Sequence, residues 1–268
     1  MCSTFAGRLV VAAALVFATP VARANTAAQS ADGPSDLIAR PLTQGEGAWL
    51  LRGNLELTLD VRGFAQPFSL APDVWYGVTQ RLTIGVVNSF SAVDLIDAGG
   101  SLCFRGAEGL CRHTYRGSGM DVLWSWLTGD FAVAPRARFL VRDVDPWKPA
   151  VTLGALARWT RGRFAISADP YLRLGVANRD LGNRATVVVP VWLALQPAAR
   201  WLLALHTGWD SELATWRDGW HVPMAIDVAH RFTPELDAGF ELGFPHVLGP
   251  QNNVKIRSAT VFVEYRAD

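Results

Sequence analysis

The sequence of 268 residues lacks an excess of charge of either sign, since 25 lysines and arginines stand against 24 aspartates and glutamates. Proteins that bind nucleic acid normally carry a basic excess, so this balance argues against a nucleic-acid partner. Lysine is also scarce. Lys148 and Lys255 are the only two, and arginine supplies nearly all of the positive charge.

Beyond the N-terminus, the sequence lacks an apolar run long enough to cross a bilayer as a helix, which takes about 20 residues. The longest charge-free candidate, Ala185 to Ala199, is too short and contains Pro190 and Pro197. A helical membrane protein is therefore excluded.

Motifs of nucleophilic catalysis, zinc hydrolysis or nucleotide binding are also missing: there is no G-x-S-x-G, H-E-x-x-H, P-loop or dinucleotide-binding glycine pattern. We therefore expect neither an enzyme nor a bound cofactor or metal.

Cysteine is nearly absent, with three residues in the chain. Residues 1–24 have the pattern of a secretory signal peptide: a basic start, an apolar run from Leu9 to Ala18, and Ala22-Arg23-Ala24 as a cleavage site. Cleavage would remove Cys2 and leave Cys103 and Cys111. In an exported chain this even pair favours a disulfide, since two thiols without a nearby histidine pair make a poor zinc site.

What the sequence does contain is alternation of apolar and polar residues, which is typical of strands with one apolar face. Residues 25–47 are polar and aperiodic and are predicted to be a linker, whereas the alternation runs from residue 48 to the end. Twelve strands are expected, near 48–62, 68–79, 82–90, 118–128, 131–142, 149–160, 163–175, 184–196, 200–210, 219–231, 235–244 and 254–265.

The predicted connections alternate between tight turns, such as Arg161-Gly162, and longer links: 91–117, 143–148, 176–183, 211–218 and 245–253. Tryptophans gather at strand ends: Trp49, Trp126, Trp159 and Trp201 lie near short turns, and Trp209 and Trp220 flank one long link. Short turns on one side, long loops on the other and aromatic residues at both ends are typical of transmembrane β-barrels.

In this pattern, residues 48–268 resemble bacterial outer-membrane β-barrel proteins of the porin-like class. The resemblance implies an all-β, membrane-spanning antiparallel up-and-down barrel, with an outer-membrane location and both chain ends on the periplasmic side. It also implies lipid and lipopolysaccharide as surroundings. The last strand, with Ala259, Val261, Val263 and Tyr265 on one face, is similar to the segment that the barrel-assembly machinery recognises.

The polar faces of the strands carry charges, which in such a barrel would line the lumen and could select solutes. Bases concentrate on the strands between residues 131 and 196, so we expect opposed walls of opposite sign. The candidate residues are Arg136, Arg138, Arg158, Arg173, Glu56, Asp121, Asp169, Asp227 and Glu241.

Two histidines, His206 and His221, share the lumenal face of neighbouring strands. If Trp209 lies opposite Trp220, the histidines are diagonal neighbours and could act as acid and base or hold a metal. Satisfied histidines in a polar network are the more common case.

Three functions follow from these observations. The first is a passive channel for small polar or charged solutes. The second is a closed barrel with a structural, adhesion or surface-binding role, and the third is an outer-membrane hydrolase that uses His206 or His221.

Overall fold

A computed structural model describes residues 37–59, 68–89, 93, 100–105, 111, 113–250 and 252–267. The chain divides into two units, Met1–Gly33 and Pro34–Asp268, and all of the described residues belong to the second.

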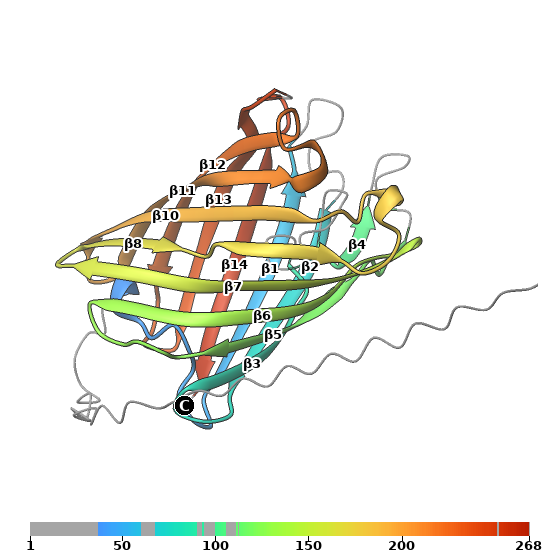
Figure 1. Cartoon of the computed structure of the whole chain (residues 1–268). Helices are drawn as coiled ribbons and strands as arrows, with labels where there is room; N and C mark the ends of the chain where they lie inside the picture. Colours follow the sequence, from blue (N-terminus) through green and yellow to red (C-terminus); the bar gives the residue numbers. More distant parts are fainter. Residues whose placement is uncertain are drawn as a thin grey trace, which may run out of the picture. The chain divides into compact units, whose positions relative to one another are not determined.

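The second unit is built from antiparallel strands that form one sheet (Figure 1). The strands are β1 (Trp49–Thr58), β2 (Phe68–Gly77), β3 (Leu82–Val87), β4 (Leu102–Arg105), β5 (Ser118–Trp124), β6 (Phe131–Val144), β7 (Trp147–Arg161), β8 (Phe164–Ala168), β9 (Tyr171–Gly175), β10 (Thr186–Ala198), β11 (Trp201–Glu212), β12 (Trp220–Arg231), β13 (Leu236–Leu248) and β14 (Ser258–Ala267). Three short 3-10 turns accompany them: η1 (Leu37–Ala39), η2 (Arg179–Leu181) and η3 (Leu213–Thr215).

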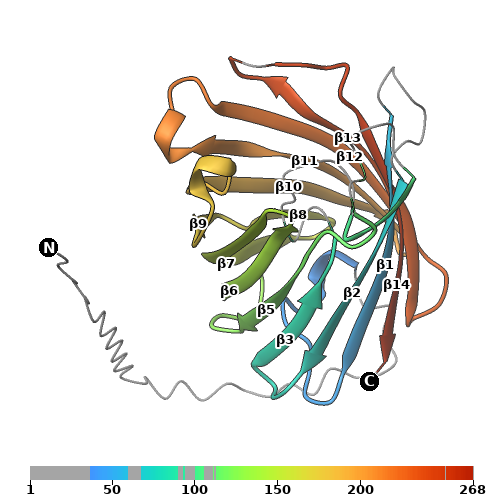
Figure 2. The same cartoon turned by 90° about the vertical axis from the view of Figure 1, so that its right-hand side faces the viewer.

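The sheet closes on itself, because β1 pairs with β2 on one side and with β14 on the other. The register between the first and last strands runs from Trp49 opposite Ala267 to Thr58 opposite Ser258. Figure 2 shows the strands arranged as a ring around a central space. Closure leaves the first and last strands without a free edge, which a sheet in lipid requires.

The barrel has twelve strands, as the alternation predicts. β8 and β9 are two halves of one barrel strand, since both pair with β7 and β10. The break falls at Pro170, which has no N–H to donate to the ladder. β4 is a short addition that pairs with β2.

Most of the described connections have the predicted alternation, with one difference. The expected link at 143–148 is only a turn at Asp145-Pro146, because β6 continues to Val144 and β7 starts at Trp147. The predicted end of the first strand, residues 60–62, and the turn that follows it lie outside the described residues. At the short-turn end, Gly162 turns the chain between β7 and β8 with φ 57°, a conformation that glycine adopts without steric cost.

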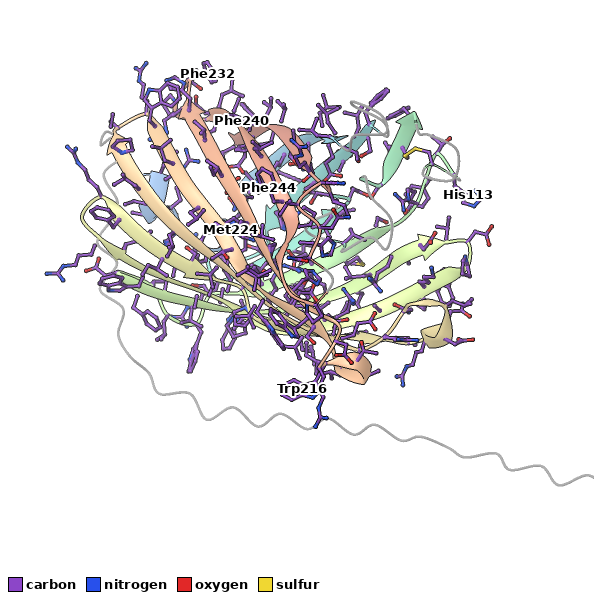
Figure 3. All side chains as sticks on the ribbon, turned by 90° about the horizontal axis from the view of Figure 1, so that it is seen from above. His113, Trp216, Met224, Phe232, Phe240 and Phe244 are labelled. Carbon is purple, nitrogen blue, oxygen red and sulfur yellow. A yellow bond between two sulfur atoms is a disulfide. The ribbon has the colours of Figure 1, made fainter. Side chains whose placement is uncertain are left out.

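The outer surface of the barrel is apolar. Large exposed side chains along the strands include Leu51, Ile84, Met120, Phe139, Leu153, Ile166, Leu193, Ile226, Phe240 and Val261. Figure 3 shows Phe240 on β13 and Phe232 just beyond the end of β12. Among the described residues, none forms a helix of the length and apolarity that a membrane span requires.

Aromatic side chains mark the short-turn end of this apolar surface. Trp49, Trp126, Trp159 and Trp201 are all more than 40 % exposed there, which agrees with the positions expected from the sequence. At the opposite end, Trp147 and Trp216 are exposed beside the links of their strands.

Part of the interior is packed with apolar side chains. Val87, Leu140 and Ala150 point inward and are buried together with Val93, which comes from the link after β3. The same link holds the disulfide between Cys103 and Cys111, with 5.8 Å between their Cα atoms, which confirms the predicted pair.

Residues 37–47, the described part of the predicted linker, pack against the inside of the barrel. Leu37 and Ile38 are buried, and η1 contacts β8, β10 and β11. In Figure 2 the 3-10 turn, in blue, lies within the ring of strands.

Candidate functional site

The inner wall of the barrel carries the charged residues singled out in the sequence. The alternating burial along each strand places all of them on the face opposite the apolar outer surface. The residues on this face are Glu56 (β1), Asp121 (β5), Arg136 and Arg138 (β6), Arg158 (β7), Asp169 (between β8 and β9), Arg173 (β9), His206 (β11), His221 and Asp227 (β12), and Glu241 (β13).

Two arginines and two aspartates form a compact cluster at mid-height on one wall. Arg136 donates from Nε to Asp121 Oδ1 at 2.8 Å and from Nη1 to Asp169 Oδ2 at 2.6 Å. Arg138 donates from Nη2 to the same Asp169 oxygen at 2.8 Å. Asp121 is fully buried and also accepts a hydrogen bond from Trp75 Nε1 at 3.1 Å.

This cluster corrects the expectation of opposed walls of opposite sign. Asp121 lies on β5, next to β6, and Asp169 lies between β8 and β9. Both form ion pairs with the arginines of β6, so the charges of Arg136 and Arg138 are neutralised locally. The sequence pattern shows which face of a strand a charge occupies. It does not show how far along the barrel axis the charges of the adjacent strands lie, and this position decides which charges form pairs.

Above the cluster, towards the long-link end, the barrel encloses a cavity of about 1080 Å³. The cavity extends from mid-barrel to the links after β9, β11 and β13. Its charged lining residues are Arg52, Arg138, Arg142, Arg173, Arg184, Arg217, Arg257, Glu56, Asp169, Asp210, Glu212, Asp218 and Glu241.

Seven arginines and six carboxylates in this lining give a nearly balanced charge. The two signs are mixed in space: Arg184, in the link after β9, pairs with Glu212 of β11, and Arg52 comes from β1, as Glu56 does. A solute in the cavity therefore meets both signs of charge on either side.

Two predicted arginines have different surroundings. Arg173 is buried and donates from Nη2 to Thr186 Oγ1 at 2.5 Å, which fixes its guanidinium against β10. Arg158 is partly buried on the inner face of β7, opposite Ala132 in register, and is not part of the cavity lining.

The predicted histidine neighbours are apart, and this expectation is wrong. β11 and β12 pair with Asp210 opposite His221 and His206 opposite Ala225, so the histidines stand four residues apart along the hairpin. The register is shifted by two residues from the one with Trp209 opposite Trp220. β11 extends to Glu212, and a 3-10 turn at Leu213–Thr215 follows it.

Each histidine has its own partners. The His206 ring stacks on Trp192 with 4.6 Å between centroids, and His206 Nδ1 lies 3.7 Å from Glu241 Oε2. Glu241 faces Asp227 in register. His221 Nε2 lies 3.8 Å from Asp210 Oδ2.

These surroundings give little support to catalysis. Ser211, the serine closest in sequence to His206 on β11, is fully buried, and its hydroxyl donates to the carbonyls of Glu212 and Trp216. Within the described part of the chain, no group of three or more His, Cys, Asp or Glu side chains is arranged to hold a metal ion.

Several lining residues were not singled out in the sequence. Trp192 stands at mid-height, and Tyr171 lies under the Arg138 guanidinium, 5.3 Å from Cζ to the ring centroid. Arg52 lies 4.2 Å from the Phe262 ring centroid. The alternation of the sequence predicts that these side chains point inward. It does not predict their stacking partners, which come from other strands.

Comparison with known proteins gives a likeness of structure alone. No family model matches the chain, and no curated protein matches it in sequence. The NanC porin superposes with a TM-score of 0.56 at 11% sequence identity, over 81% of this chain and 98% of the porin. The KdgM porin superposes with a TM-score of 0.51 at 6% identity, over 81% of this chain and 98% of that porin.

At these identities the likeness establishes the fold. The match extends over nearly the whole of both porins and over most of the barrel described above. The chain is therefore a closed β-barrel of twelve strands that shares its fold with these two porins.

Proposed function

We propose that the protein is an outer-membrane channel for the passive passage of small polar or charged solutes. The observation that carries this proposal is the charged cavity inside a closed barrel whose outer surface is apolar. The porin fold supports it, since both solved structures named above are called porins. The partners of such a protein are lipid and lipopolysaccharide at the outer surface and the barrel-assembly machinery at β14.

Insertion in a bilayer makes a specific prediction for the outer surface. Leu153 lies at the middle of β7 and is 56% exposed. Leu153→Arg is expected to lower the free energy of unfolding from lipid by about 3 kcal/mol, because an arginine on the lipid face at mid-depth is costly. Urea titration in lipid vesicles measures the change.

The matched control is Leu213→Arg in η3, where the leucine is 49% exposed on a link beyond the strands. It should change stability by less than about 1 kcal/mol, as at the membrane interface. Equal effects of the two variants would contradict a lipid-facing β7.

Ion selectivity tests the channel itself. Arg184 lines the cavity near its mouth and pairs with Glu212 at 3.2 Å, with 42% of its side chain exposed. Arg184→Glu places two carboxylates there, so the ratio of cation to anion permeability should rise about twofold, by Coulomb's law with screening. Reversal potentials in planar bilayers with a salt gradient measure this ratio.

Two further variants sharpen the test. The exchanged pair Arg184→Glu/Glu212→Arg restores the local charge and should return the ratio to that of the unaltered protein. Arg179→Glu changes an exposed arginine of η2 that does not line the cavity, and it should leave the ratio unchanged. An Arg184→Glu protein that conducts with unaltered selectivity would show that ions do not pass this mouth.

A further inference from the structure

The segment from Leu37 to Ala48, called the strap below, crosses the interior of the barrel before the first strand begins. At its first end, Leu37 and Ile38 are 8% and 5% exposed, and η1 contacts β8, β10 and β11. The Ile38 amide donates to Gln196 Oε1 of β10 at 3.3 Å. This end of the strap is therefore seated on one side of the barrel.

The middle of the strap reaches a second part of the inner wall. Arg40 donates from Nη1 to Asp237 Oδ2 of β13, and the same nitrogen lies 3.6 Å from Glu264 Oε1 of β14. The Arg40 side chain is only 15% exposed. Both carboxylates belong to the inner face, so this arginine points across the lumen and not out of it.

The last part of the strap lies against β2 and β3. The Gln44 amide donates to Thr83 Oγ1 at 2.8 Å, and the Gly47 amide donates to the Gly77 carbonyl at 2.9 Å. In the closed order of strands, five strands separate β10 from β2 in either direction, with β8 and β9 counted as one. The strap therefore spans the barrel from one side to the opposite side.

The inner wall is shaped to receive the strap at Gly77. A Cβ atom at this position would lie 1.7 Å from the Gly45 carbonyl oxygen and 2.6 Å from its carbon. Only glycine lets the strap backbone approach β2 this closely.

The cavity stops short of the strap, since no strap residue lines it. Its lowest lining residues on the surrounding strands are Arg52, Asp169, Trp192, His206 and Glu241. Closer to the short turns, the inner wall presents Thr83, Gln196 and Asp237, and these contact the strap. The strap therefore lies between the cavity and the short-turn end of the barrel.

We propose that the strap is the closing element of the channel, and that solutes pass only when it leaves the inner wall. This inference rests on the proposed channel function. Its contacts include a few hydrogen bonds, the ion pairs of Arg40 and the buried apolar side chains of Leu37, Ile38 and Ala48, which are few compared with the hydrogen-bonded ladders of the barrel. The strap can therefore move while the barrel stays intact.

The test uses single-channel recording from the full-length barrel in planar bilayers, with two opposite changes. Gly77→Val places a side chain where the strap backbone lies, so we expect a severalfold larger mean current than from the unaltered protein. Gln44→Cys/Thr83→Cys, joined by a short bifunctional thiol reagent, holds the strap in place and should abolish openings.

Gly53→Val is the matched control for the first change, since Gly53 faces outward on the neighbouring β1 with nothing within 4 Å of its Cβ position. It should conduct like the unaltered protein. The unaltered protein treated with the same reagent controls for the second change. If Gly77→Val fails to fold, Leu37→Ser/Ile38→Ser/Arg40→Ser loosens the strap without altering the wall.

A second readout does not depend on conduction. Ala165 is 3% exposed on the inner face of β8, which η1 contacts. Ala165→Cys should react slowly with a membrane-impermeant thiol reagent and severalfold faster when the strap carries the three serines. Equal labelling rates would contradict a mobile strap.

The outcomes separate the two proposals. Equal currents from the unaltered, Gly77→Val and cross-linked proteins would overturn the proposal that the strap closes the channel. They would still be consistent with the proposed channel function. Folded barrels that never conduct, with the strap displaced or in place, would overturn both and favour a closed barrel with a structural or surface-binding role.

Discussion

Asp121→Ala is expected to lower the free energy of unfolding by about 3–5 kcal/mol, the usual effect of removing one partner from a buried ion pair. Asp121 is fully buried and accepts hydrogen bonds from Arg136 and Trp75, and Arg138 Nε lies 3.6 Å away. Without it, Asp169 alone would face two buried guanidinium groups. Urea titration of the folded barrel, followed by tryptophan fluorescence, measures the loss.

A double variant and a control identify the cause. In Asp121→Ala/Arg136→Leu, the arginine that would lose its ion-pair partner is removed as well. This double variant should therefore be less destabilised than Asp121→Ala alone. Asp130→Ala changes an exposed aspartate in the turn of the same β5–β6 hairpin and should have little effect. A loss below about 1 kcal/mol for Asp121→Ala would show that the cluster behaves like a solvent-exposed pair.

Asp73→Ala is expected to cost about 4 kcal/mol, because it leaves buried donors without an acceptor. Asp73 Oδ1 accepts the amides of Asn88 and Ser89 at 2.6 and 3.0 Å, and Oδ2 accepts Asn54 Nδ2 at 3.2 Å. These bonds hold the start of the link after β3, from which Val93 packs into the interior.

The matched variant is Asp73→Asn, which keeps one acceptor oxygen for the two amides and loses the charge. It should cost less than half as much in the same urea titration. A second measurement is amide hydrogen exchange at Ser101, whose amide donates to the Asn88 carbonyl. Exchange there should accelerate in Asp73→Ala, and unaltered exchange would show that Asp73 does not anchor this link.

The fold could be predicted from the sequence because lipid and lumen impose a strict alternation on each strand. All twelve strands were placed this way, even the interrupted strand at Pro170. The inward side of the charged residues follows from the same parity. The disulfide between Cys103 and Cys111 was predictable from the cysteine count in a chain expected to be exported.

What parity cannot supply is the relative height of neighbouring strands. A two-residue difference in the register of β11 and β12 separates His206 from His221. Height also decides that Asp121 and Asp169 meet Arg136 and Arg138, so the predicted charged wall is neutral there.

The strap shows a second limit of the sequence. Residues 37–47 have no period, and their contacts depend on single side chains such as Arg40 and Ile38. A polar, aperiodic segment is typical of a linker, and no local pattern distinguishes one that binds inside a barrel. The wall that receives it, with Gly77 at its closest approach, comes from distant parts of the chain.

The pairing of β1 with β14 also has a consequence for biogenesis. Trp49 and Ala267 are partners in register although nearly the whole barrel separates them in sequence, so this seam has the largest loop-closure entropy of all the pairings. During synthesis β1 emerges first and its partner last, so its edge stays unpaired until the chain is complete. The strap precedes β1, so it is already present before the partner strand of this seam is synthesised.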